Sequence, residues 1–544
     1  MSIAAVSPTA TARRARPAPG RAVTRLAIRQ VRRGGLIVVA LSGGVTALVA
    51  ATYAQVMADP AAAGSLQALA GNPAIRTLFG PPVGLDTAGG FTVWRVGTFL
   101  AVLLATWSVL ATTRVTRGEE DAGRWDMLLA GIVPLRAVLI RHLAAVAAVP
   151  VVTGAAITVV LLASGTAAPG ALVHGAGTGL LGVFFVAVAA LAAQVFPSRT
   201  PATGSAIVVL GLGLLARMIG DGVTELGWLH WLSPFGLLAL SGPYVQDRVV
   251  PLVLLLVAAA VIAAGALAVA GRREVREGLV AASPARRPRL GLLGGVEAFA
   301  VRRVLRPLTG WTIGIGAYYL LIGLTAVSIT GFLADNPALA DEAAQAGFAE
   351  LGSIAGISAT LFAILAMPVS GFAAVRMGAF VAAETDRRLV LLAAGPVSRT
   401  RLIGADIAAT ACATAVLVTA AGMATWAGAA VTGGDFSPVE ALTGAWNVLP
   451  IVGLSLGTAV FATGWAPRWV GVVGVLPATG GFLLLVIADS IAAPGWVRDL
   501  SPYAHLAPVP LADADWTATT VMLGIAALLT VAGLAGYRRR DLRS

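Results

Sequence analysis

The residues with the clearest chemical potential form a charged island between two long apolar runs, at 117–129, where the sequence reads RGEEDAGRWDMLL. A weaker copy, AETDRRLVLL, occupies 383–392. Each copy is followed by a short phrase that ends in arginine, PLR at 134–136 and PVSR at 396–399. A repeat offset by about half the chain indicates two related halves, because small-unit solenoids repeat over much shorter distances.

The first island predicts an amphipathic helix over 119–132. Its apolar residues recur at i, i+3, i+4 and i+7 and form one stripe, namely Trp125, Leu128, Leu129 and Ile132. Glu120 and Asp121 precede Arg124 by four and three residues, so either can pair with it on the polar face. The second island predicts a shorter stripe of Leu389, Leu392 and Ala393, with Glu384 paired to Arg387 or Arg388.

Composition places these islands in a membrane protein. Of the 544 residues, 58% are hydrophobic and only 12% are charged, with a mean hydropathy of +0.86. Soluble domains carry about 25% charged residues. We therefore expect an all-α polytopic membrane protein of about twelve spans, each near the ~20 residues that a bilayer requires. The predicted spans are 35–55, 91–113, 138–163, 173–195, 203–220, 248–271, 311–332, 352–375, 402–430, 437–463, 469–489 and 516–537.

These spans predict two pseudo-symmetric halves of six helices each. Residues 1–34 would be a basic cytoplasmic tail, 35–271 the first half, 272–310 a cytoplasmic linker, 311–537 the second half and 538–544 a cytoplasmic tail. An even number of spans per half makes both halves enter the membrane from the same side. Turn-forming pairs recur in the outer loops of both halves, namely Asn72-Pro73 and Asn336-Pro337, then Ser233-Pro234 and Ser501-Pro502.

The charge pattern sets the topology and excludes several functions. The net charge is +12, and all 38 basic residues are arginines. Most of them fall on one side of the predicted membrane, which indicates cytoplasmic loops and two cytoplasmic termini rather than nucleic-acid binding. A chain without lysine lacks the residue that reaches the β/γ-phosphates in P-loop ATPases. The same absence excludes Schiff-base chemistry.

No catalytic or metal-binding constellation stands out. The single Cys412 lies in an apolar run, and the four histidines are scattered, so we expect no disulfide, metal or cofactor. Ion-driven carriers keep a carboxylate or histidine near mid-bilayer. We place Asp406 and Asp221 near helix ends and expect only mild polar residues such as Asn447 in the interior. The transported solute would then be apolar or amphipathic.

The islands resemble the cytoplasmic motif of type-2 ABC exporter permeases. With its duplicated marks, the whole chain past the N-terminal tail is similar to double-length actinobacterial permeases described as exporters of polyketide antibiotics. The resemblance implies a permease, not an enzyme, in the bacterial plasma membrane, with two copies of a cytoplasmic ABC ATPase as partners. The residues implied in ATPase coupling are Glu119, Glu120, Asp121, Arg124, Glu384, Asp386, Arg387 and Arg388.

Three interpretations remain open from the sequence. The first is an ATP-driven exporter of hydrophobic drug-like or antibiotic molecules, with the islands as docking helices that suit a symmetric partner dimer. The second is a secondary multidrug transporter driven by an ion gradient, in which the islands only complete the inner surface as solvated helices. The third is a non-transport membrane protein such as a lipid-modifying enzyme, which a polar cluster at the outer surface would favour.

Overall fold

The computed structural model describes residues 19–56, 76, 80–82, 84–275, 277–280, 291–335, 352–385, 389, 396–490 and 493–540. Within these ranges every regular element is a helix, and twelve helices are long and apolar enough to cross a bilayer. The predicted all-α multi-pass fold is therefore confirmed. Several predicted site residues lie outside the described ranges, namely Asn72, Pro73, Asn336, Pro337, Asp386, Arg387 and Arg388.

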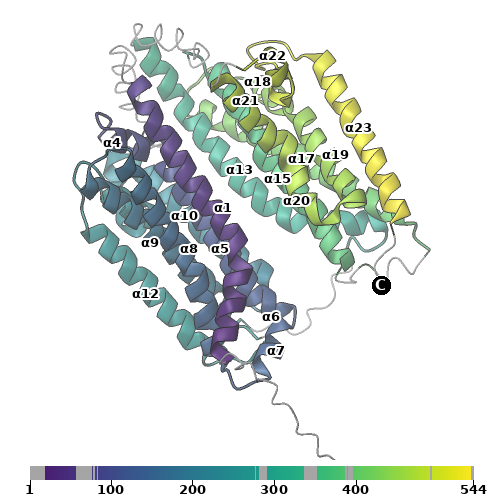
Figure 1. Cartoon of the computed structure of the whole chain (residues 1–544). Helices are drawn as coiled ribbons and strands as arrows, with labels where there is room; N and C mark the ends of the chain where they lie inside the picture. The colour runs from purple at the N-terminus through teal and green to yellow at the C-terminus, as the bar shows by residue number, and fades with distance from the viewer. Residues whose placement is uncertain are drawn as a thin grey trace, which may run out of the picture. The chain divides into compact units, whose positions relative to one another are not determined.

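The chain divides into two compact units, residues 1–286 and 287–544. Figure 1 draws the first from purple to teal and the second from teal through green to yellow. Each unit contains six of the candidate spans. The division falls inside the stretch expected to act as a linker, but the first helix of the second unit also begins within that stretch, at Val296.

Unit 1 is organised around α9 (Ala168–Val195). Its small residues are buried along most of its length, and it packs against four other spans of the unit, α5, α8, α10 and α12. Outside the first charged island, the other elements are α1 (Pro19–Val56), α4 (Ala88–Thr92), η1 (Val93–Gly97), α5 (Thr98–Thr113), α8 (Leu135–Ala163), α10 (Arg199–Gly222), η3 (Thr224–Leu232), α11 (Pro234–Leu240) and α12 (Val250–Ala270).

Unit 2 has a core of buried aromatic and aliphatic side chains between its long helices, including Phe362, Phe372, Leu417 and Ile451. Its spans are α13 (Val296–Asp335), α15 (Ile354–Thr385), α17 (Arg399–Val431), α18 (Pro438–Trp446) with α19 (Leu449–Trp465), the group η6 (Pro467–Trp469), α20 (Val470–Val475), η7 (Leu476–Gly480) and α21 (Gly481–Ser490), and α23 (Trp516–Arg539). Two short helices, α22 (Gly495–Asp499) and η8 (Pro502–His505), precede α23.

The first helix of each unit starts earlier than hydropathy predicts. α1 begins at Pro19 rather than near 35, and α13 begins at Val296 rather than near 311. Along α1, Val23, Ala27 and Val31 are buried at four-residue spacing, whereas Arg25 and Arg29 between them are exposed. The apolar stripe packs against α8, so the helix continues through the arginine-rich stretch that a hydropathy window discards.

The two Ser-Pro pairs perform the same structural task in each unit. The Ser233 hydroxyl donates to the Gly213 carbonyl at 2.6 Å, and the Ser501 hydroxyl donates to the Gly481 carbonyl at 2.8 Å. Each hydroxyl also accepts a backbone N–H from the helix that follows it. Both serines are fully buried. The same cap, reaching back the same distance in sequence, supports the predicted duplication of the fold.

Glycines bring neighbouring spans of unit 2 into backbone contact. A Cβ added at Gly323 on α13 would lie 2.1 Å from the Thr425 carbonyl oxygen on α17. A Cβ at Gly428 on α17 would lie 2.3 Å from the Leu320 carbonyl oxygen. Membrane helices associate through such small-residue contacts because lipid tails provide no hydrophobic driving force between them.

We predict that Gly323→Ala destabilises unit 2 by about 1–3 kcal/mol, because the new methyl group overlaps backbone atoms of α17. Gly314→Ala on the same helix is the matched control, since nothing lies within 4 Å of its Cβ position. The measurement is thermal unfolding of the purified protein in detergent. Equal midpoints for the two variants would contradict the close packing of α13 on α17.

Candidate functional site

The first charged island lies at one end of unit 1, against the start of α1. Trp125 is fully buried there in a cluster with Val23, Val138, Leu139 and Ala270, which come from α1, α8 and the end of α12. The exposed arginines of α1 lie at the same end. We call this the arginine-rich end of unit 1.

The predicted single helix over 119–132 is wrong. The structure instead has a π-helical turn, η2 (Arg114–Gly118), then α6 (Glu119–Asp121) and α7 (Arg124–Leu129). Gly123 separates the last two with φ 71°, a left-handed conformation that ends a helix and that glycine adopts without steric cost. The apolar stripe is shortened as a result, because Ile132 is 88% exposed.

Glu120 is at the centre of a buried ion cluster. Arg273, just after α12, makes two parallel contacts with its carboxylate, Nη1 to Oε1 at 2.6 Å and Nη2 to Oε2 at 2.8 Å. Arg117 contributes Nη1 at 3.0 Å from Oε2. The three side chains are between 0 and 3% exposed. Glu120 therefore does not lie on the solvent-facing polar surface that a simple amphipathic helix predicts.

The same two arginines tie the island to other chain segments. Arg117 donates from Nε to the Phe196 carbonyl at 2.8 Å and from Nη2 to the Glu277 carbonyl at 2.7 Å. Arg273 donates from Nε to Gln194 Oε1 at 2.8 Å. The end of α9, the segment after α12 and the island are thus joined in one network. A displacement of the island would be transmitted to these helix ends.

The neighbouring acids have other partners than those predicted. Arg124 forms a two-pronged pair with Glu119, with Nε to Oε2 at 2.6 Å and Nη2 to Oε1 at 2.8 Å. Asp121 accepts the backbone N–H of Arg199 at 2.7 Å, at the start of α10. The turn at Gly123 rotates Arg124 away from the register of a continuous helix, which explains why simple i, i+4 spacing misleads here.

Unit 2 repeats the central contact. Glu384, at the end of α15, is ion-paired with Arg540, which follows α23 as Arg273 follows α12. Arg540 also donates from Nη1 to the Thr463 carbonyl at 2.9 Å, at the end of α19. Leu389 of the second island is buried, as its predicted stripe requires. The arginine that follows the last span of each unit therefore holds the acidic residue of that unit's island.

Part of the first island remains open to solvent. The Arg124 side chain is 55% exposed, Met127 is 74% exposed and Ile132 is 88% exposed. Asp126 is exposed beside them. The island thus has two layers, a buried ion cluster on the helix ends and an outer surface that mixes apolar and charged groups.

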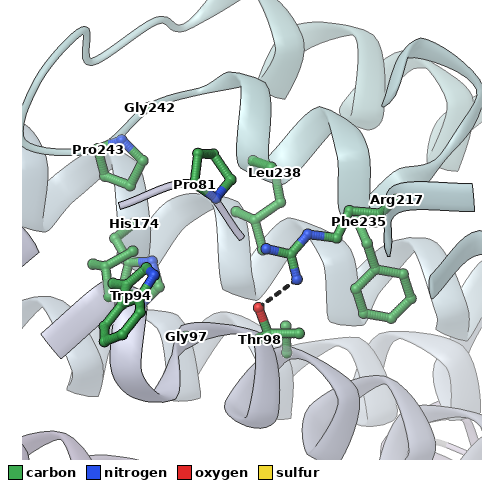
Figure 2. Close-up of a pocket in the computed structure, with 13 residues that line it drawn as sticks. Pro81, Trp94, Gly97, Thr98, His174, Arg217, Phe235, Leu238, Gly242 and Pro243 are labelled. Atoms are coloured by element: carbon green, nitrogen blue, oxygen red, sulfur yellow. Dashed lines mark hydrogen bonds between the residues drawn. The ribbon is translucent and has the colours of Figure 1, made fainter. Parts of the chain in front are cut away.

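Sequence reasoning placed Asp221 and Asp406 near helix ends but missed their arginine partners, of which Arg217 and Arg376 are buried. Arg217 on α10 pairs through Nε with Asp221 at 2.6 Å and donates to the Thr98 hydroxyl on α5 at 2.6 Å (Figure 2). In unit 2, Asp406 lies 2.7 Å from Arg303 and 3.4 Å from Arg376. The four-residue spacing of Arg217 and Asp221 could have predicted their salt bridge from the sequence. The group around Asp406 could not be predicted in this way, because its three residues come from three different helices.

His230 extends the first of these networks. It lies in η3, outside the spans, and its Nε2 is 2.8 Å from Asp221 Oδ1. The hydrogen bond to Asp221 raises the pKa of His230 above its ordinary value of 6.5, and its partial burial opposes that shift. The protonated ring is therefore favoured in the folded protein.

We predict that Glu120→Gln costs about 3–5 kcal/mol of stability, because it leaves two buried arginines without their carboxylate. Glu119→Gln is the matched control. It breaks a pair with the largely exposed Arg124 and should cost about 1 kcal/mol or less. Thermal unfolding in detergent measures both, and a larger loss for Glu119→Gln would refute the buried cluster.

We predict that thermal stability depends on the His230 proton. When the pKa of a histidine is higher in the folded protein than in the unfolded chain, its protonation stabilises the folded state. This contribution is complete below pH 6.5 and is lost as the pH rises through the pKa of the folded state. The unfolding midpoint of the wild type should fall between about pH 6 and about pH 9, a range that brackets the ordinary histidine pKa of about 6.5. His230→Gln should remove that decrease, whereas the exposed His505→Gln should keep it. An unchanged pH profile in His230→Gln would contradict the assignment.

Similarity to known proteins agrees with this architecture. A family model described as the C-terminal domain of the multidrug efflux system permease Rv1217c matches residues 21–269 and 293–538. The chain is also 32% identical over 516 residues to the multidrug efflux system permease protein Rv1217c of Mycobacterium tuberculosis (strain ATCC 25618 / H37Rv), covering 93% of this chain and 91% of that protein. The matched ranges include both islands and both Ser-Pro caps. The chain belongs to the Rv1217c family of multidrug efflux permeases.

Proposed function

We propose that the chain is the transmembrane subunit of an ATP-driven ABC exporter in the bacterial plasma membrane. It would move hydrophobic drug-like or antibiotic molecules out of the cell. Both termini and the arginine-rich ends would face the cytoplasm, following the positive-inside rule. Two copies of a separate ATPase would dock on the islands, one on each unit.

The observation that carries the proposal is the repeated pairing of Glu120 with Arg273 and of Glu384 with Arg540. In each unit a side chain of the island is fixed to the segment after the last span. A partner that pushes on the island therefore pushes on packed helix ends instead of a free loop. Rigid-body motion of that kind is how domains switch between two conformations.

The outer surface of the first island provides the contact for the partner. Met127 and Ile132 present apolar area, and Arg124 and Asp126 surround them with charge. Protein interfaces combine an apolar centre with a polar rim in this way. The partner must supply ATP hydrolysis, because a chain without lysine cannot form a P-loop of its own.

The alternative is a secondary multidrug transporter driven by an ion gradient. Such a carrier needs a carboxylate or histidine that takes up and releases the ion within the membrane. Asp221 and Asp406 each form a salt bridge with arginine, and both lie toward an end of their helix rather than at its middle. This observation favours the ATP-driven mechanism.

We predict that Met127→Glu reduces the ATPase activity that purifies with the tagged permease by at least about tenfold, the loss expected from about 1.4 kcal/mol of binding energy. The side chain is 74% exposed, so the variant should fold. Leu511→Glu, at a 45% exposed position in the loop before α23, is the control and should retain the activity.

Two outcomes would overturn the proposal. The first is a permease that purifies from native membranes without any ATPase activity. The second is transport that stops when ion gradients are collapsed although ATP is maintained. Either result would support the secondary transporter instead.

A further inference from the structure

Unit 1 contains a small cavity of about 90 Å³ at the end of the unit opposite the arginine-rich end (Figure 2). It lies between α5 with η1, α9, α10 and the segment from α11 to Pro243. Its walls are mainly apolar, with Trp94, Phe235 and Leu238 among them, and three polar side chains line it, Thr98, His174 and Arg217. This mixture of apolar walls with a few placed polar groups is typical of small-molecule sites.

His174 is the polar group that most clearly lacks a structural purpose. It is only 3% exposed, and it has no hydrogen-bond partner among the residues that the structure describes. Its ring packs against Gly97, where an added Cβ would lie 3.1 Å from the ring carbon Cε1. Buried polar groups are normally hydrogen-bonded, so an unpartnered one in a cavity wall can bond to a group that enters the cavity.

Arg217 gives the cavity a polar wall that is already charge-balanced. Its guanidinium pairs with Asp221, and it donates to the Thr98 hydroxyl at 2.6 Å. An anionic ligand would have to compete with Asp221 for the arginine, and a cationic ligand would meet an arginine at close range. A desolvated charge without a partner is costly in either case, so the site favours an uncharged ligand.

Two of the cavity-lining positions correspond to larger or apolar side chains in unit 2. In the register that pairs Glu120 with Glu384, Thr98 corresponds to Phe362, which is 1% exposed and stacks on Tyr319 with ring centroids 5.8 Å apart. In the register that pairs Ser233 with Ser501, Arg217 corresponds to Leu485. The repeated fold therefore does not require a cavity here, and unit 1 differs from unit 2 at the residues that form one.

We propose that this cavity binds one uncharged aromatic ring that carries a hydrogen-bonding oxygen, such as the phenolic or aryl-carbonyl end of a larger amphipathic molecule. The ring would lie against the apolar wall that includes Trp94, and its oxygen would bond to His174. A volume of about 90 Å³ is several times the roughly 10–15 Å³ that one water needs by the same measure, so the cavity has room for a group of this size. The identification of this ligand with the exported molecule rests on the proposed function. The binding of the ligand in the cavity does not depend on that function.

The test uses the full-length protein in detergent without ATP or partner, and 4-fluorophenol as the probe, followed by fluorine NMR. Saturable binding is expected for the phenol, and none is expected for 4-fluorobenzoate, because its charge is uncompensated. His174→Leu should weaken binding about tenfold through the lost hydrogen bond. His174→Gln, which can still form a hydrogen bond, should remain close to the wild type, and His505→Leu is the control for an unrelated histidine.

Thr98→Phe introduces the residue of unit 2 and should abolish binding by occupying the cavity. Its thermal unfolding midpoint is measured in parallel. If this variant does not fold, the comparison of His174→Leu with His174→Gln decides whether the proposal holds. No saturable phenol binding, equal binding of benzoate, or equal affinity of His174→Leu and wild type would overturn the proposal. A loss of partner ATPase with phenol binding intact would instead count only against the exporter function.

Discussion

The cost of burying an unpaired charge constrains the arginine-rich end of unit 1, and a similar ion pair lies at the end of unit 2 that carries Glu384 and Arg540. Glu120 is 1% exposed and Glu384 is 13% exposed, and each is paired with an arginine from beyond the last span of its unit. Pairing therefore brings the end of the six-span segment back to the turn after its second span. In unit 1 the same cluster orders the end of α9 through Gln194. These contacts hold the island on the helix ends, so the position of the island depends on how the helices pack.

Comparison of the two units distinguishes the contacts that both contain from the features that only one contains. Both units keep the glutamate–arginine pair and the buried serine that caps the next helix. They differ at the opposite end. Unit 1 has a cavity beside Thr98 and His174, and unit 2 has the buried ring of Phe362 at the corresponding place.

Prediction from the sequence succeeded where a single local property decides the structure. Long apolar runs must be helices in a bilayer, so all twelve spans were predictable from hydropathy alone. It failed where two properties compete. The arginines of α1 lower its hydropathy, yet Val23 and Ala27 hold the helix on α8. In the first island the periodicity of 119–132 predicts one helix. The left-handed turn at Gly123 interrupts that helix, and Arg124 pairs with Glu119 instead of the predicted partners.

The sequence by itself determined the membrane class, the two-fold repeat and the location of the islands, because composition, length and order carry those properties. The absence of lysine likewise decided that this chain has no P-loop. Only the tertiary structure decided which charges are buried and which are exposed. Arg273 and Glu120 are distant in the sequence, as are Arg376 and Asp406, and His174 becomes a candidate ligand-binding residue only when α9 packs beside α5 and α10. Spacing within one helix cannot encode such contacts, since they depend on how separate helices pack.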